Sequence, residues 1–248
     1  MQALASVEKA VDVLFHLHRE AGGRGVTAIG RALGMPKSSA HRVLAALTRR
    51  GLVERDEDGR YRPGMALVAL GLGALEREPV VAAARPLLEA EAAGLGETCF
   101  LVGARARRLV VLDKAEGTGF LRAAPRVGSE VPVHATAAGK LFLAFDPQAV
   151  ESPTGALERF TARTCTRPEE VWREAAAVRR QGIALSREEW IAGLSAVAAP
   201  VRRGEQLVGA LALAAPTPRL EALGWDAVVR RIRAAADAVS ARLAGRGR

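Results

Sequence analysis

One segment near the start of the chain has residue types and a spacing that point to a specific chemistry. When residues 37–50 are wound as a helix at about 100° per residue, they divide into two contrasting faces. The first face is apolar and consists of Ala40, Val43, Leu44 and Leu47. The opposite face carries positive charge and short hydrogen-bonding groups and consists of Ser38, His41, Arg42, Ala45 and Arg49. This composition favours a helix that docks into DNA.

The charge around this helix supports that interpretation. The thirty-three residues from 21 to 53 contain six basic side chains and no Asp or Glu, so no carboxylate there would repel a phosphate. The whole chain has a formal net charge of +9, which suits a polyanionic partner. The alternative to a DNA-binding helix is an ordinary helix whose charged face contacts only solvent, because most runs of charged residues are solvated helix faces.

Two helices are predicted before the basic helix. Apolar residues at three- and four-residue steps predict a first helix from about residue 6 to residue 19, with Ser6 as its N-cap. A second, short helix should start at Thr27, which is a cap-type residue. Its inward-facing residues would be Ile29, Ala32 and Leu33.

A tight turn should connect the second helix to the basic helix. Gly34 suits the turn, and Pro36 suits the start of a new helix. A helix, a glycine turn and a basic helix in this order predict a helix-turn-helix pair.

A β-hairpin, or wing, should follow the basic helix. Residues 52–55 and 60–62 flank a turn at residues 56–59. Alternation places Arg60 and Arg62 on one face, where they can meet phosphate, and Tyr61 on the inward face.

The turn of this hairpin is acidic. Asp56, Glu57 and Asp58 would be repelled by a DNA groove. The wing therefore contacts DNA through its second strand or hardly at all, and a surface hairpin without DNA contact stays an open alternative.

These elements give a set of expected DNA contacts. Base edges or adjacent phosphates would be contacted by Ser38, Ser39, His41 and Arg42. The phosphate backbone would be neutralised mostly by Lys37, Arg49, Arg60 and Arg62, and the preceding helix would add Thr27 and Arg31. The expected partner is double-stranded DNA with a near-palindromic operator, bound by a two-fold dimer.

The segment that follows the wing is apolar on almost every side. Residues 65–75 read MALVALGLGAL, and a helix with this composition is buried. It packs either against a second subunit or in the core of its own domain, and the sequence leaves both open. We therefore expect a DNA-binding domain at residues 1–64, a linker helix at 65–79 and a second domain at 80–248.

The second domain is predicted to be α+β, with a largely antiparallel sheet. A helix should run from residue 80 to Gly94. Strands are predicted at residues 98–102, 109–114, 120–122, 183–187, 194–202 and 207–215. Helices are predicted at residues 136–145, 168–180 and 226–243.

A ligand site is expected where the helix of residues 136–145 begins. The side chains from Val133 to Gly139 are small enough for a molecule to approach the backbone, and free N–H groups favour an anion. Ser195 could donate a hydrogen bond to the same molecule. Tight packing of the helix on the sheet is the alternative reason for the small residues.

Catalysis, metal binding and cofactors find little support. His134 could in principle act with Glu188 and Glu189, but no nucleophile lies in a recognisable setting. We expect His134 to be structural and to bond a backbone carbonyl near the helix start. Cys99 and Cys165 lack the spacing of a metal knuckle and should be reduced.

The sequence also indicates where in the cell the protein is expected. No segment has a signal-peptide pattern or about eighteen uncharged apolar residues. We expect a soluble, cytoplasmic protein with no membrane partner.

The first third of the chain also resembles the DNA-binding half of the IclR-type transcriptional regulators. The resemblance rests on residues 34–42 (GMPKSSAHR), 51–53 (GLV) and 59–64 (GRYRPG). It continues downstream through 96–98 (GET), 126–129 (RVGS), 132–140 (PVHATAAGK), 188–189 with Gly193, and 198–201 (AAPV). The resemblance implies a winged helix-turn-helix joined to a GAF-like effector-binding domain that acts as a dimer or a dimer of dimers.

The resemblance also implies which residues would surround a small-molecule effector. They are His134, Ala135, Thr136, Gly139, Glu188, Ser195, Ala212 and Ala214. The family often has Ser where Ala212 and Ala214 stand, so this pocket should be less polar and suit an aromatic or otherwise apolar acid. Two alternatives stay open: an enzyme built on the second domain with a basic appendage, and a nonspecific architectural DNA binder, which would lack sequence preference.

Overall fold

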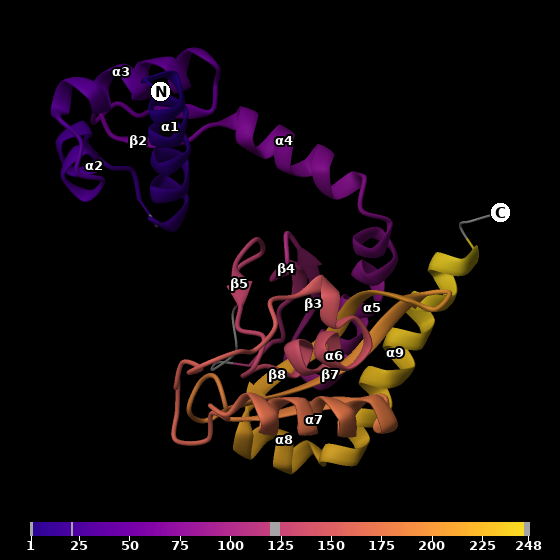
Figure 1. Cartoon of the computed structure of the whole chain (residues 1–248). Coiled ribbons are helices and arrows are strands. Elements are labelled where there is room, and N and C mark those ends of the chain that lie inside the picture. Colours follow the sequence, from indigo (N-terminus) through magenta and orange to yellow (C-terminus); the bar gives the residue numbers. More distant parts are fainter. Residues whose placement is uncertain (1, 21, 120–124, 246–248) are drawn as a thin grey trace. The chain divides into compact units, whose positions relative to one another are not determined.

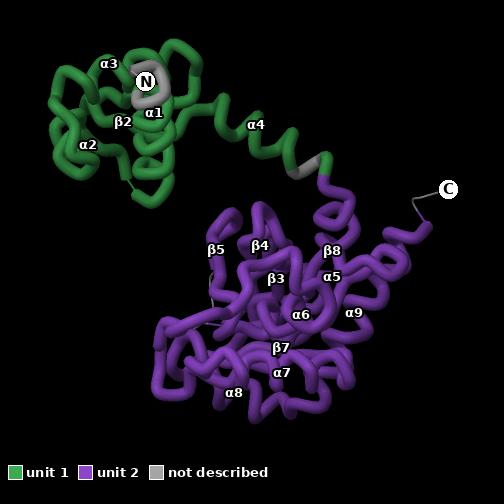
Figure 2. Tube along the Cα trace, in the orientation of Figure 1, with its two compact units in different colours: residues 1–77 green, residues 78–248 purple. Residues whose placement is uncertain are grey.

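The computed structural model describes residues 2–20, 22–119 and 125–245. The chain divides into two compact units, residues 1–77 and 78–248 (Figure 1; Figure 2). The linker helix expected at residues 65–79 begins in the first of these units.

The first unit is a winged helix-turn-helix, as the sequence predicts. Its core combines residues from its first three helices and from the wing, among them Leu17, Ile29, Leu44 and Tyr61. Its elements are α1 (Gln2–Arg19), α2 (Val26–Ala32), α3 (Lys37–Arg49), β1 (Val53–Arg55), β2 (Tyr61–Pro63) and α4 (Met65–Glu76).

Two helix starts differ from the prediction. Helix α1 begins at Gln2, so Ser6 lies inside the helix and is not its N-cap. The residues before Ser6 include Ala and Leu, which are strong helix formers and extend the helix backwards. Helix α2 begins at Val26, because the carbonyl of Gly25 already accepts a hydrogen bond from the N–H of Ile29. Thr27 therefore lies in the first turn instead of capping it.

The inward face of α2 is also smaller than predicted. Ile29 is fully buried and Leu33 is half-buried, but Ala32 is exposed. Helix α2 has only seven residues, so its last residue already lies at the turn, beyond the part of the helix that packs on the core.

Helix α4 is exposed along its apolar side chains. Met65 is 68% exposed, Leu70 65% and Leu72 57%. The interpretation of this segment as a core helix of its own domain is therefore wrong, because those side chains are not covered within the chain. Packing against a second subunit stays a prediction.

The second unit is built on one antiparallel sheet of six strands in the order β5-β4-β3-β8-β7-β6. Its strands are β3 (Thr98–Arg105), β4 (Arg108–Ala115), β5 (Glu130–Val131), β6 (Ala184–Arg187), β7 (Leu194–Arg203) and β8 (Gln206–Pro216). Its helices are α5 (Pro79–Leu95), α6 (Ala137–Phe145), η1 (Pro147–Ala149), α7 (Pro168–Gln181), α8 (Thr217–Leu223) and α9 (Trp225–Gly245). The α+β class and the antiparallel sheet are as predicted.

Helices cover both faces of this sheet. Helix α6 packs on β6, β7 and β8, and α7 packs on α6, while α5 packs on β3 and β4 and α9 packs on β7. Alternate strand residues, such as Ala198 and Ala212, belong to the core under α6. Their neighbours Val197 and Leu213 are equally buried and point to the other face, because successive side chains of a strand alternate.

Several boundaries were missed. Helix α5 passes through Gly94 and ends at Leu95, because Gly96 adopts the left-handed conformation that closes it. The two-residue β5, η1 and the seven-residue α8 were not predicted, since elements this short have little periodicity. The strand expected at residues 120–122 lies outside the described residues.

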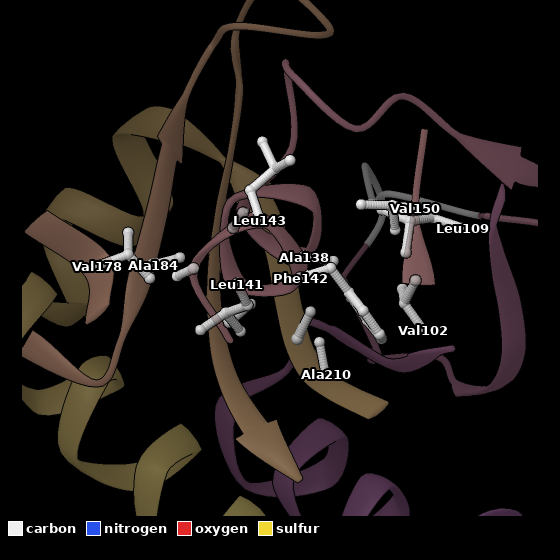
Figure 3. Packing of buried hydrophobic residues seen from close by; sticks show 14 of the residues in the cluster. Val102, Leu109, Ala138, Leu141, Phe142, Leu143, Val150, Val178, Ala184 and Ala210 are labelled. Carbon is white, nitrogen blue, oxygen red and sulfur yellow. The ribbon is translucent and has the colours of Figure 1, made fainter. Parts of the chain in front are cut away.

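Helix α6 is the most deeply buried helix of the second unit. All eight residues from Ala137 to Ala144 are buried, and Phe142 lies beside Val102 and Ala210 (Figure 3). The close approach needs a glycine, because a Cβ on Gly139 would overlap the backbone carbonyl of Val133. The small residues of this segment thus serve tight packing.

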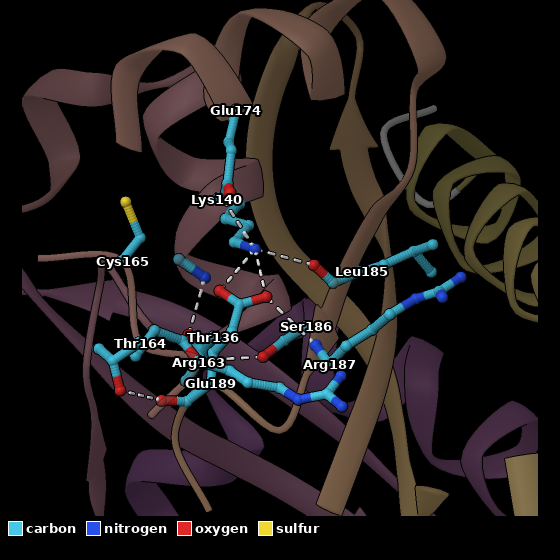
Figure 4. A network of polar contacts seen from close by, with 12 residues as sticks. Thr136, Lys140, Arg163, Thr164, Cys165, Glu174, Leu185, Ser186, Arg187 and Glu189 are labelled. Atoms are coloured by element: carbon cyan, nitrogen blue, oxygen red, sulfur yellow. Dashed lines mark hydrogen bonds and ion pairs between the residues drawn. The ribbon is translucent and has the colours of Figure 1, made fainter. Parts of the chain in front are cut away.

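One charged residue is buried with this helix. Lys140 is 4% exposed, and its Nζ lies 2.7 Å from the carboxylate of Glu189 and 2.9 Å from that of Glu174. It also donates to the carbonyl of Leu185 at 3.1 Å (Figure 4). The backbone carbonyl of Glu189 accepts a hydrogen bond from Thr164 at 2.6 Å. This network ties α6 to α7 and to the segment that follows β6.

We predict that Lys140→Met destabilises the second unit by about 3–5 kcal/mol, because it leaves the buried Glu189 without its counter-charge. The measurement is urea unfolding followed by tryptophan fluorescence. All three tryptophans lie in the second unit, so the signal reports on that unit.

The matched control is Lys114→Met. Lys114 pairs with Glu116 at 2.6 Å, but the side chains of this pair are 24% and 37% exposed. Partial solvation limits the expected loss to less than about 1 kcal/mol. Equal losses in the two variants would contradict a special role of the buried pair.

Candidate nucleic-acid interface and ligand cavity

The polar face of α3 is open to solvent. Ser38, His41, Arg42 and Arg49 are exposed, as is Lys37 at the start of the helix, and Ser39 is half-buried. The opposite face packs into the core through Ala40, Leu44 and Leu47. The division into two faces is therefore the one that the sequence indicates.

The basic side chains of α3 have no acidic partner. Across the described residues, no ion pair involves Lys37, Arg42 or Arg49. By contrast, Arg24, which precedes α2, is paired with Glu20. The charge on α3 is thus available to an external anion.

The turn between α2 and α3 fixes how the helix is presented. Gly34 has a φ of +61°, a conformation that suits glycine, and the N–H of Met35 donates to the carbonyl of Gly30 at 2.8 Å. Thr27 and Arg31 are exposed on α2. They and the polar face of α3 belong to the same rigid pair of helices.

The wing shows the predicted alternation of Arg60, Tyr61 and Arg62, with strands at Val53–Arg55 and Tyr61–Pro63 in place of the expected 52–55 and 60–62, and its surface is more neutral than expected. Arg60 and Arg62 are exposed, and Tyr61 is buried. Arg62 pairs with Glu54 on the neighbouring strand at 3.3 Å. The carboxylate of Asp56 accepts the N–H of Arg60 at 2.8 Å, so one of the three turn carboxylates closes the hairpin.

A second candidate site is a cavity of about 230 Å³ in the second unit. It lies between the start of α6, the strands β3, β7 and β8, and the segment after β6. Its lining is mostly apolar, and the large residues in it are Phe100, Val102, Val131, Trp190, Ile191 and Leu194.

The structure brings five of the eight predicted effector residues to this cavity. They are Ala135, Thr136, Ser195, Ala212 and Ala214. His134, Gly139 and Glu188 do not line it. His134 lies within 2.9 Å of the carbonyl of Glu158 and stacks on Phe160.

Gly139 and Glu188, the other two predicted effector residues outside the cavity, contact other parts of the second unit. Gly139 faces the backbone of Val133. Glu188 has a φ of +59°, its carbonyl accepts a hydrogen bond from Thr161 at 2.7 Å, and its carboxylate lies 3.9 Å from Arg163.

The start of α6 gives the cavity its polar edge. The hydroxyl of Thr136 accepts the N–H of Gly139 at 3.1 Å and donates to the carbonyl of Pro132. The N–H groups of Ala137 and Ala138 have no acceptor within the helix, because the first turn of a helix lacks preceding carbonyls. Both residues line the cavity, so an anion there would meet two backbone donors.

Sequence reasoning missed most of the apolar wall. Strand alternation could have identified Phe100 and Val102, because residues two apart point to the same face. Nothing in the sequence marks Trp190 and Ile191, which lie in an irregular segment that the buried Lys140–Glu189 pair holds in place.

Metal ligation and thiol chemistry find no support among the described residues. Within the described residues, no group of three or more His, Cys, Asp or Glu side chains is arranged to hold a metal ion. Burial raises the pKa of the Cys99 thiol to about 12, so that thiol stays protonated and unreactive. None of the helices in the described ranges is long and apolar enough to cross a membrane.

Comparison with known protein families matches both units. The model described as the IclR helix-turn-helix domain matches residues 6–57. The model described as the C-terminal domain of the bacterial transcriptional regulator IclR matches residues 72–241.

Individual relatives agree over most of the chain. The chain is 33% identical over 203 residues to the probable transcriptional regulator SauR of Cupriavidus necator, covering 80% of this chain and 81% of the relative. It is similar to the crystal structure of an IclR-type regulator from Alicyclobacillus acidocaldarius, with 31% identity, a TM-score of 0.80 and coverage of 96% and 98%. It is also similar to an IclR homologue from Microbacterium hydrocarbonoxydans, crystallised with 4-hydroxybenzoate, with 25% identity, a TM-score of 0.85 and coverage of 97% and 99%.

Proposed function

The chain belongs to the IclR family of DNA-binding transcriptional regulators, and we propose that it binds a near-palindromic operator as a dimer whose affinity for DNA is changed by a small organic acid. The observation that carries the DNA-binding part is the exposed face of α3, where Lys37, Arg42 and Arg49 form no ion pair with any residue that the structure describes. The ligand-binding part rests on the apolar cavity at the start of α6.

The residues on α3 have different roles in this proposal. Ser38, Ser39, His41 and Arg42 reach base edges or the nearest phosphates, since the first half of a recognition helix enters the major groove. Lys37 and the residues farther from the groove neutralise the phosphate backbone. Those residues are Arg31, Arg49, Arg60 and Arg62, and the uncharged Thr27 donates a hydrogen bond from its hydroxyl to a phosphate.

A second copy of the chain would cover α4. Exposed apolar side chains such as Met65, Leu70 and Leu72 are unfavourable in water, and burying them against the same helix of a second copy removes that cost. A two-fold dimer of this kind presents two copies of α3 to half-sites about one helical turn apart. A dimer of dimers would add a second such pair.

The ligand is proposed to be an aromatic acid. A cavity of roughly 150 Å³ lined by apolar side chains accommodates benzene, so 230 Å³ suits a substituted ring. Alanine at positions 212 and 214 keeps the sheet wall apolar, while the N–H groups of Ala137 and Ala138 suit a carboxylate. The relative crystallised with 4-hydroxybenzoate supports the same chemical class.

A purely regulatory role fits this cavity better than catalysis. His134 and Glu188, the residues that a catalytic hypothesis would need, do not line it. The relatives reported above are named as transcriptional regulators. Turnover of a bound acid by the purified protein would support the enzyme alternative instead.

We predict that Arg42→Ala weakens operator binding by about 1–3 kcal/mol and weakens random-duplex binding by less, because a base contact is lost along with the charge. The operator would be a duplex selected by the protein from a random-sequence library, and both affinities would be measured by fluorescence anisotropy at one salt concentration. Arg230→Ala removes an equally exposed charge on α9 and serves as the control, with no expected loss. Equal losses on both duplexes for Arg42→Ala would reduce Arg42 to a phosphate contact.

We predict a steep salt dependence of operator binding. If a dimer neutralises about four to eight phosphates, the logarithm of the affinity falls against the logarithm of salt concentration with a slope of roughly −4 to −7. In the variant Arg60→Ala with Arg62→Ala, the slope becomes shallower if the wing contacts DNA and is unchanged if it does not. An affinity that does not depend on salt would exclude the electrostatic interface altogether.

We predict that an aromatic carboxylate stabilises the full-length protein. At a concentration of about 100 times its dissociation constant, a ligand adds about 2.7 kcal/mol, which raises the melting temperature by roughly 5–10 °C. Thermal-shift measurements would compare benzoate, phenylacetate and 4-hydroxybenzoate with acetate. Ala212→Leu fills the cavity and should abolish the shift, and a shift that survives this substitution would place the ligand elsewhere.

A further inference from the structure

Thr98 has a buried hydroxyl group without a hydrogen-bonding partner. Its exposed fraction is 0%, and no donor or acceptor among the described residues contacts its Oγ1. Leaving a buried hydroxyl unpaired destabilises a folded protein. A group of this kind therefore needs a reason to be retained.

The strand register places this hydroxyl on the cavity side of the sheet. Thr98 on β3 is paired with Ala214 on β8, and Phe100 with Ala212. Directly opposite residues of antiparallel strands point to the same face, with Cβ atoms about 4.5–5.5 Å apart. Phe100, Ala212 and Ala214 all line the cavity. Thr98 thus lies one strand beyond Ala214, in the same row and on the same face.

The other hydroxyl groups around the cavity are already used. Thr136 caps α6, and Ser186 donates to the carbonyl of Ala135 at 3.1 Å. The hydroxyl of Ser195 lies 2.8 Å from that of Thr217, at the start of α8. Thr98 is therefore the hydroxyl on this part of the sheet, among the residues described, that remains available to a ligand.

We propose that Thr98 is a specificity-determining residue of the cavity, whose hydroxyl forms a hydrogen bond with a polar group of the bound aromatic acid. This inference rests on the proposed function, since it assigns a contact to the same ligand. Thr98 does not itself line the cavity, so in this proposal an acid that lies over Ala214, the strand partner of Thr98, extends its polar substituent to the hydroxyl. The hydroxyl is then satisfied in the complex and unsatisfied without ligand.

This role predicts opposite effects on stability and on binding. Thr98→Val replaces the hydroxyl by a methyl group of similar size and removes the unpaired polar atom. The melting temperature without ligand should rise by about 2–4 °C. Affinity for the acid should fall roughly fivefold to tenfold, because one hydrogen bond is lost. If the role of Thr98 were purely structural, Thr98→Val would not both raise the melting temperature and lower the affinity for the acid.

The experiment uses the full-length protein and isothermal titration calorimetry with benzoate and 4-hydroxybenzoate. Thr98→Ser keeps the hydroxyl and should bind within about threefold of the original protein. Thr164→Val is the matched control for stability, because Thr164 is also buried but its hydroxyl is bonded to the carbonyl of Glu189. Its melting temperature should fall instead of rising.

The outcomes separate the two proposals. If the original protein binds neither acid and neither raises its melting temperature, the aromatic-acid proposal fails, and the inference on Thr98 fails with it. If the original protein and Thr98→Val bind equally, only the role of Thr98 is overturned. A loss for both acids supports a bond to the carboxylate, and a loss for 4-hydroxybenzoate alone supports a bond to the ring hydroxyl.

Discussion

The second unit depends on the burial of a helix that carries a charged residue. Helix α6 is enclosed by the sheet and by α7, so the ammonium group of Lys140 must find its counter-charge inside the protein. Glu189 supplies it. The same ion pair joins the segment after β6 to the first turn of α6, and both segments line the cavity. The packing of α6 and the lining of the cavity thus depend on the same electrostatic constraint.

The first unit follows a different constraint, because its functional face must remain outside the core. Apolar residues of α3 at three- and four-residue steps bury one side of the helix, and this fixes the opposite side in solvent. Residues 21–53 contain no carboxylate, and within the described ranges Arg42 and Arg49 on that side form no ion pair. Exposure and unpaired charge therefore arise from the same short stretch of sequence.

This difference explains how much could be predicted from the sequence. The polar face of α3 was predicted residue by residue, because periodicity within one helix determines it. The cavity needed contacts between distant segments: the small side chains before α6 indicate Ala135 and the family resemblance indicates Ala212, whereas neither identifies Phe100 or Trp190. His134 was expected both as a structural residue and as an effector residue. Its contact with the carbonyl of Glu158 agrees with the first of these expectations.

Regulation requires that the cavity and α3 influence each other, and the structure offers one direct connection along the chain. Phe100 lies on the cavity face of β3, α5 packs on β3, and α5 follows α4, which contacts the wing strand β1. A ligand that binds all arrangements of these elements equally well would change nothing, however tightly it bound. Control of DNA binding by the cavity therefore requires at least two arrangements of the protein, and the ligand must prefer one of them.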